Sequence, residues 1–184
     1  MAIVKYENFI GDIYYLNKRK TKKGNLTYYF SKKKKDVVEK IPEGYEIDEK
    51  ADGKVYLIKE TPKIISGEEK KIIETSIKKY SNAKYYRVYV KKGVITVYLA
   101  QDNADSLMSF IGPFSDQKKL KKYLNYSSKM RFSLVDENTR IFKVERYCYR
   151  GSIDDWIYLD EGELKDLARV YCAHLGEDSF YDLI

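Results

Sequence analysis

Side chains capable of catalysis are few in this sequence and lie far apart. His174 is the single histidine, and Cys148 and Cys172 are the two cysteines. His174 and Cys172 lie two residues apart on an expected helix, where side chains point about 200° apart and cannot bind one ion together. A structural zinc site takes four Cys or His ligands, and the chain has three such residues in all. We therefore predict no metal site, and we interpret His174 as a structural residue.

Acidic pairs are the second possible source of chemistry. They occur at Asp154-Asp155 and at Asp160-Glu161. A nuclease-type metal site needs acids that converge from a strand, whereas the pattern predicts that Asp160 begins a helix, where acids stabilise the helix dipole. The motifs G-x-x-x-x-G-K-[ST], G-x-G-x-x-G and G-x-S-x-G do not occur. We therefore predict a protein that is not an enzyme and that uses no cofactor.

A basic and aromatic run, residues 14–35, carries the strongest functional signal. It reads YYLNKRKTKKGNLTYYFSKKKK and contains no acid. Clustered Lys and Arg bind phosphates by releasing counterions, without reading base sequence, and Tyr15 and Tyr29 could stack on unpaired bases, which is worth ~1–3 kcal/mol per base. We interpret the run as a surface that binds DNA or RNA mainly through the phosphate backbone. Its cations are Lys18, Arg19, Lys20, Lys22, Lys23, Lys32, Lys33, Lys34 and Lys35.

Other interpretations of the basic run stay open. The tyrosines could form a second core layer under helices, with the lysines only solvating the tip of a hairpin. Residues 1–40 carry eleven Lys/Arg against four acids, and residues 151–184 carry two against nine. The acidic end could fold back over the basic front, or the basic front could dock on an acidic partner, including the acidic end of another copy. A protein-interaction or self-assembling subunit is therefore the alternative function.

Four β-hairpins are predicted to position these residues, because apolar and polar residues alternate around turn signals. The turns fall at residues 22–24, 52–53, 92–93 and 136–138. In the first hairpin, the predicted register places Tyr15 and Tyr29 on the face opposite the apolar one. The predicted cross-strand pairs are Leu16 with Phe30, Ile47 with Ile58, Val88 with Val97, and Phe132 with Phe142.

Helices are predicted between and after the hairpins. Ser66 and Glu69 form a capping box for a helix that ends near Tyr80, and a last helix runs from Asp160 to Gly176. Shorter helical segments are predicted at residues 36–41, 104–112 and 116–125.

This order of elements predicts an α+β fold in which antiparallel β-hairpins alternate with helices, with two small ββαββα-like halves as one arrangement. A boundary near residue 62 would separate a basic, hairpin-rich half, residues 1–62, from an α+β half with an acidic end, residues 63–184. The two halves could equally form one domain.

The run YYLNKRKTKKGNLTYYFSKK, followed by IPEGYEI, resembles a family of uncharacterised prokaryotic proteins in which a Lys-rich aromatic hairpin precedes a Gly-Tyr-Glu strand. The likeness covers about residues 10–60. It implies a cytoplasmic, prokaryotic protein and carries no assigned activity or site residues. No apolar run approaches the roughly 20 residues that span a bilayer, and two cysteines are too few for a disulfide framework. Both observations agree with a cytoplasmic location.

Overall fold

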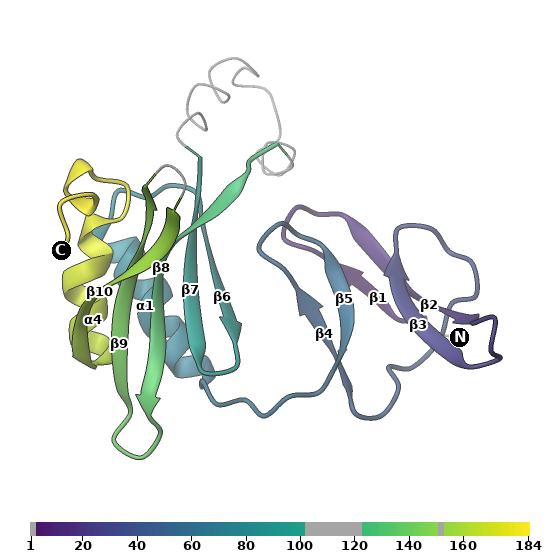
Figure 1. Ribbon diagram of the computed structural model, residues 1–184. Coiled ribbons are helices and arrows are strands. Elements are labelled where there is room, and N and C mark those ends of the chain that lie inside the picture. The colour runs from purple at the N-terminus through teal and green to yellow at the C-terminus, as the bar shows by residue number, and fades with distance from the viewer. Residues whose placement is uncertain (1–2, 102–122, 151–152) are drawn as a thin grey trace. The chain divides into compact units, whose positions relative to one another are not determined.

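The computed structural model describes residues 3–101, 123–150 and 153–184 and has an α+β fold, as predicted. Its described residues form three antiparallel sheets and two α-helices (Figure 1). They group into two compact units. The N-terminal unit holds the described residues up to Thr61 together with Tyr123 and Leu124, and the C-terminal unit holds those from Pro62 to residue 101 and from Asn125 onward. That these units are separate domains stays a prediction.

The N-terminal unit consists of a sheet in the order β1-β2-β3 and of the hairpin β4-β5. Its small core is centred on Leu16, which is fully buried, and on Val55. The described residues of this unit include no helix, so a ββαββα arrangement is not seen in it. The strands are β1 (Lys5–Glu7), β2 (Ile13–Lys20), β3 (Leu26–Ser31), β4 (Tyr45–Glu49) and β5 (Val55–Lys59).

The hairpin β2-β3 has the predicted register and turn. Leu16 faces Phe30 across the ladder. Gly24 adopts a φ of 80°, and its N–H donates to the carbonyl of Thr21 over 2.9 Å. Because L-residues rarely adopt this left-handed conformation, glycine is required at this position of the turn.

The hairpin β4-β5 differs from the predicted register by one residue. Ile47 faces Leu57 and not Ile58. The loop holds three residues between Lys50 and Lys54, which are joined by a hydrogen bond of 2.9 Å from the Lys50 N–H. Gly53 alone in this loop has a positive φ, of 81°, whereas a two-residue type I′ turn needs two such residues. The extra loop residue shifts every cross-strand pair.

Residues 36–38 are extended, so the helical turn predicted at residues 36–41 is wrong. The Lys18 N–H donates to the Asp36 carbonyl over 2.9 Å, and the Val38 N–H donates to the Leu16 carbonyl over 3.0 Å. This segment therefore continues along β2 from the point where β1 stops. Two consecutive β-branched valines favour this extended pairing.

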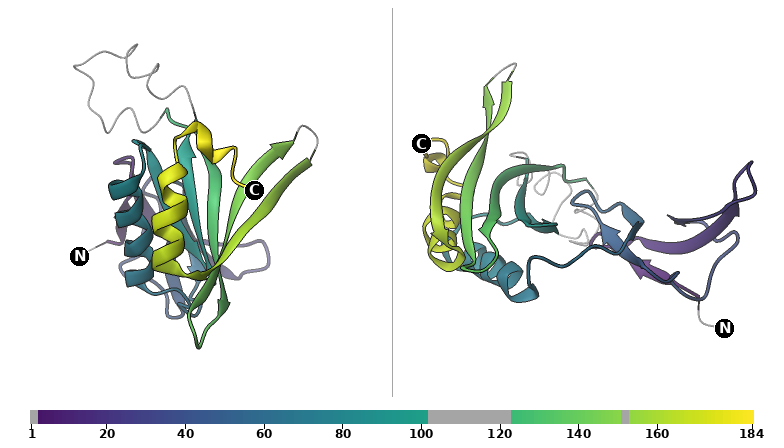
Figure 2. Two further views of the ribbon diagram at one scale, coloured as in Figure 1. Left: turned by 90° about the vertical axis from the view of Figure 1, so that its left-hand side faces the viewer. Right: turned by 60° about the horizontal axis from the view of Figure 1, so that its bottom comes forward.

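The C-terminal unit is a five-stranded antiparallel sheet in the order β10-β9-β8-β7-β6. Both helices lie side by side on one face of this sheet (Figure 2, left). The elements are α1 (Gly67–Tyr80), β6 (Tyr86–Lys91), β7 (Val94–Ala100), β8 (Tyr126–Asp136), β9 (Ile141–Arg150), β10 (Ile153–Glu163) and α4 (Leu164–Tyr171), with 3₁₀ turns at Cys172–His174 and Asp178–Phe180.

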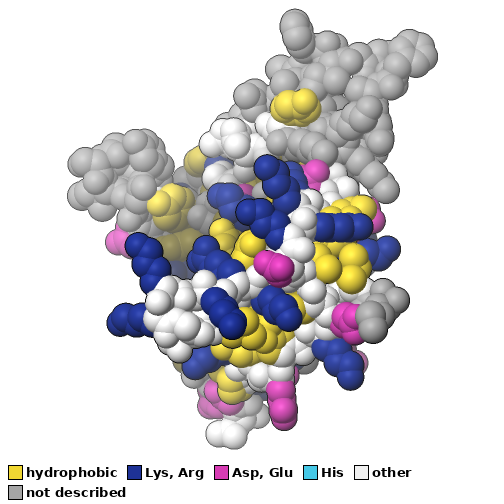
Figure 3. Space-filling view, turned by 90° about the vertical axis from the view of Figure 1, so that its right-hand side faces the viewer, with side chains coloured by type: hydrophobic (Ala, Val, Ile, Leu, Met, Phe, Trp, Pro, Cys, Tyr) yellow, Lys and Arg dark blue, Asp and Glu magenta, His cyan; other side chains and the backbone are white. Residues whose placement is uncertain are grey.

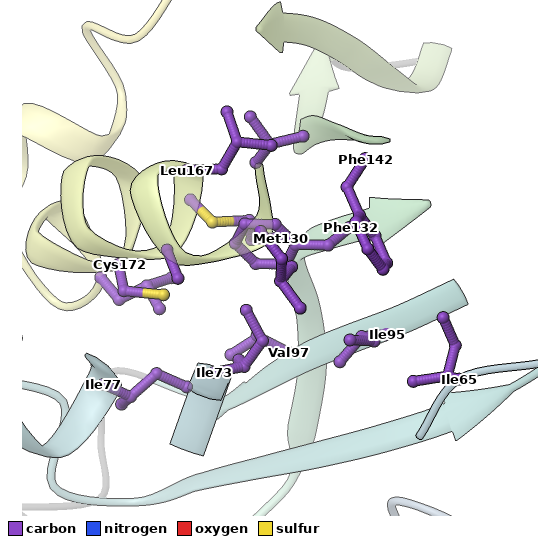
Figure 4. Close-up of a cluster of buried hydrophobic side chains, with 14 of the residues drawn as sticks. Ile65, Ile73, Ile77, Ile95, Val97, Met130, Phe132, Phe142, Leu167 and Cys172 are labelled. Atoms are coloured by element: carbon purple, nitrogen blue, oxygen red, sulfur yellow. The ribbon is translucent and has the colours of Figure 1, made fainter. Parts of the chain in front are cut away.

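The core of this unit lies between the helices and the sheet (Figure 4). Ile73 and Ile77 of α1 face Val97 and Phe132 of the strands, and all four side chains are fully buried. The capping box at the start of α1 and the pairing of Val88 with Val97 are confirmed. Tyr80, which the predicted helical stripe included, is exposed at the end of α1.

The hairpin β8-β9 also differs from the predicted register. Phe132 faces Val144, and Phe142 faces Leu134. A bulge between Leu134 and Asp136 inserts one extra residue, and the turn is longer than predicted. Phe132 and Phe142 are nevertheless both fully buried, because the shift of two residues keeps each side chain on the core face.

The last helix is shorter than predicted. Asp160 belongs to β10, and α4 begins only at Leu164. Trp156, expected in a short extended segment, lies in the same eleven-residue strand. Gly176, with a φ of 86°, follows the helical region as predicted. The helices predicted at residues 104–112 and 116–125 lie almost wholly outside the described residues.

Candidate nucleic-acid interface

The nine cations of the basic run all lie on the surface of the N-terminal unit and are exposed. They form two groups. The ribbon group sits on the outer part of the hairpin β2-β3 and its tip, and the loop group, Lys32 to Lys35, follows β3. Lys and Arg side chains gather on the face that this unit presents in Figure 3. The ribbon group consists of Lys18, Arg19, Lys20, Lys22 and Lys23.

Asn17 holds the loop group against the hairpin. Its side chain is fully buried, and its Nδ2 donates to the carbonyls of Tyr15 at 2.9 Å and of Lys33 at 3.1 Å. Its Oδ1 accepts from the Lys35 N–H over 2.8 Å. The loop backbone is therefore fixed while the four lysine side chains stay exposed. Sequence reasoning missed this role, although asparagine is depleted in strands and its place within β2 was a signal.

Most of these cations have no acidic partner. Lys32 forms a salt bridge with Asp12 at 2.7 Å, and this hydrogen bond raises the pKa of Lys32 above its usual value. Among the residues that the structure describes, it is the one salt bridge made by the nine cations. The other eight cations lie close together on this hairpin and the loop after it and repel one another, so a polyanion that binds them relieves this repulsion.

Tyr15 and Tyr29 lie on the same face of the hairpin, as predicted, and both are half-buried. Each ring already has a cation over it. The Lys34 Nζ lies 4.8 Å from the centre of the Tyr15 ring, and the guanidinium carbon of Arg19 lies 5.4 Å from that of Tyr29. Such contacts orient the cations. A base could stack on these cation-covered ring faces only by displacing the cation.

The residues considered for catalysis are not brought together. The His174 Nδ1 lies 2.9 Å from the Ser179 Oγ, which gives this ring a local structural contact. Cys172 is buried, and burial raises the pKa of its thiol to about 12. Within the described ranges, no three His, Cys, Asp or Glu side chains are grouped so that they could hold a metal ion.

One charged cluster lies on the face of the large sheet opposite the helices. The Arg131 guanidinium donates to both carboxylate oxygens of Glu145, at 2.6 and 2.9 Å, and lies 4.3 Å from the centre of the Trp156 ring. Burial acts to raise the pKa of Glu145, but hydrogen bonds and charge from Arg131 and Lys143 hold it below its usual value. These groups satisfy one another, which is typical of a structural ion pair.

Comparisons with protein-family models, with curated proteins and with solved structures find no match to this chain. In the part of the chain that the structure describes, no helix has the length and apolar character needed to cross a membrane.

Proposed function

We propose that this protein is a non-enzymatic nucleic-acid-binding module that contacts mainly the phosphate backbone through the hairpin β2-β3 and the loop after it. The observation that carries this proposal is the buried Asn17, which fixes the loop group beside the ribbon group. A fixed loop loses less conformational entropy on binding than a free lysine tail would.

The chemistry follows from the charges. Each phosphate that a Lys or Arg neutralises releases condensed counterions, so affinity falls as salt rises, with a slope of about 0.9 per neutralised phosphate on duplex DNA. If all eight cations without a salt bridge bound phosphates, the slope of log K against log salt would approach about −7. Such binding positions a nucleic acid without selecting its sequence.

The test is the salt dependence of binding to a labelled 24-base-pair duplex and a single strand of unrelated sequence. Changing Lys20, Lys22 and Lys23 to Gln should weaken binding to every sequence alike. It should also flatten the salt slope by about 0.7–0.9 for each phosphate that the variant no longer neutralises. Equal affinity of the triple variant and the parent at every salt concentration would refute the role of the hairpin.

A matched control removes the same charge elsewhere. Lys40, Lys59 and Lys63 are exposed and lie outside the hairpin and its loop. Their change to Gln should lower affinity only through net charge, and therefore much less than the hairpin variant does. If both triple variants bound equally weakly, general positive charge and not this surface would be responsible.

The second candidate is a self-assembling or protein-interaction subunit. It is favoured by the acids of β10, which lie on an edge strand of the large sheet and could meet the basic hairpin of another copy. Mass measured against concentration should then rise, and high salt should abolish the rise. Acids on an edge strand also disfavour pairing of that strand with another molecule, so protection of the sheet edge is the competing explanation of these acids. Among the β10 residues whose burial the structure describes, the exposed acids are Asp155, Asp160, Glu161 and Glu163.

A further inference from the structure

Among the residues that the structure describes, the outer part of the hairpin β2-β3 is a two-stranded ribbon without a third strand. On the other edge of β2, β1 and residues 36–38 pair only as far as Lys18. Residues 19–27, which we call the free ribbon, therefore extend past the sheet (Figure 2, right). Their exposed side chains include the apolar Leu26, of which 48% is accessible.

The free ribbon has the size of an element that enters the major groove of DNA. Two paired strands lie about 4.8 Å apart, and the major groove, about 12 Å wide, admits such a ribbon. Lys22, at the turn, is three positions beyond Arg19, and at about 3.3 Å per residue of strand this gives a reach of about 10 Å. The groove is about 8.5 Å deep, so the turn can reach its floor.

The loop group lies where it can contact the rim of that groove. Asn17, which holds the loop, is two residues from Arg19, or about 7 Å along the strand. With the ribbon inserted, Lys33 to Lys35 would therefore lie at the level of the phosphates, while Lys22 and Lys23 lie deeper, between the two backbones whose phosphates they help to neutralise. Proteins that place a β-ribbon in a groove of DNA are also positioned by contacts to the flanking phosphates, and here the loop group could make those contacts.

Two considerations favour double-stranded DNA over single strands and over double-stranded RNA as the ligand. Cations cover the rings of Tyr15 and Tyr29, which disfavours stacking on the unpaired bases of a single strand. Double-stranded RNA has a deep and narrow major groove that side chains cannot read. We propose, on the basis of the nucleic-acid function above, that the ligand is double-stranded DNA and that the free ribbon enters its major groove.

Binding to three ligands of one sequence tests the proposal. Anisotropy with 24-base-pair duplex DNA, the matching duplex RNA and the single DNA strand should show duplex DNA bound at least ten-fold more tightly than either of the others. Equal affinity for all three, or tighter binding of RNA or of the single strand, would overturn this proposal and leave backbone binding intact. Absence of binding to all three at low salt would instead refute the nucleic-acid function itself.

DNA whose major groove is blocked by a base modification tests whether the free ribbon enters that groove. A duplex whose cytosines carry glucosylated hydroxymethyl groups keeps its phosphates but has a blocked major groove, so the parent protein should bind it at least ten-fold more weakly. The loss caused by Lys22→Gln with Lys23→Gln should nearly vanish on this duplex, because the ribbon is already excluded. Lys33→Gln with Lys35→Gln, the matched control, should cost the same on both duplexes. Undiminished binding of the modified duplex would overturn groove entry.

Discussion

Replacing Asn17 by alanine should release residues 33–35 from the hairpin without removing any charge. The buried side chain makes three hydrogen bonds, with the carbonyls of Tyr15 and Lys33 and with the N–H of Lys35. Each such bond contributes about 0.5–1.5 kcal/mol net, and a partner left buried without a bond costs more. We therefore expect the free energy of unfolding of the N-terminal unit to fall by about 2–4 kcal/mol.

Amide hydrogen exchange of the full chain, followed by NMR, measures this effect locally. The Lys35 amide, whose partner is the Asn17 Oδ1, should lose its protection. The Val38 amide, bonded to the Leu16 carbonyl, should exchange roughly 30- to 900-fold faster, which is the same free energy expressed as a rate ratio. Asn25→Ala is the matched control, because Asn25 is exposed at the tip of the same hairpin, where a substitution changes stability by less than ~0.5 kcal/mol.

Binding of duplex DNA should also weaken in Asn17→Ala, although all nine cations remain, because the loop must then be ordered on binding. If the Lys35 amide stays protected and the free energy of unfolding stays within ~0.5 kcal/mol of that of the parent, Asn17 does not fix the loop. In that case the loop is held by something other than the Asn17 amide.

Three further predictions concern the C-terminal unit. Val88→Asp puts a charge against the core and should cost several kcal/mol, so normal cooperative melting, followed by the fluorescence of Trp156, would contradict the packing. The pKa of Glu145 is lower in the folded protein than in the unfolded chain, so its ionised form stabilises the fold above the unfolded pKa of about 4.3, and this stability is lost as pH falls through the folded pKa. Glu145→Gln should therefore flatten the decline of the denaturation midpoint below about pH 5. An unchanged decline would show that other acids cause it. Iodoacetamide should label Cys148 before Cys172, whose thiol is buried with its pKa raised to about 12, and mass spectrometry showing the reverse order would contradict this burial.

The sequence predicted where all four β-hairpins lie, but it predicted the strand register correctly in only two of them. It predicted the pairs Leu16 with Phe30 and Val88 with Val97, because alternation and turn length agree in those hairpins. It failed for Ile47, because an Asp-Gly signal does not reveal whether the loop holds two or three residues. It failed for Phe132 because a bulge leaves no local signature in the sequence.

The sequence predicted which residues make up the candidate site, but it did not predict how the loop group is held beside the hairpin. The nine cations and the shared face of Tyr15 and Tyr29 follow from alternation within the hairpin. The role of Asn17 depends on a return of the chain at residues 36–38, which only tertiary pairing defines. A helical interpretation of that segment therefore hid the role of Asn17, whose side chain bonds to the loop backbone at both Lys33 and Lys35.

The placement of α1 and α4 has a consequence for synthesis of the protein on the ribosome. α1 is the first element of the C-terminal unit and α4 is the last α-helix, and the two pack together although 83 residues separate them in the sequence. The side of α1 that packs on α4 must therefore stay uncovered until Leu167 and Cys172 have left the exit tunnel, even after the strands have covered the rest of its core face. At about 5–20 residues per second, this delay lasts roughly 5–20 s. The nascent chain thus exposes part of an apolar helix face for seconds, which is the kind of surface that chaperones bind during translation.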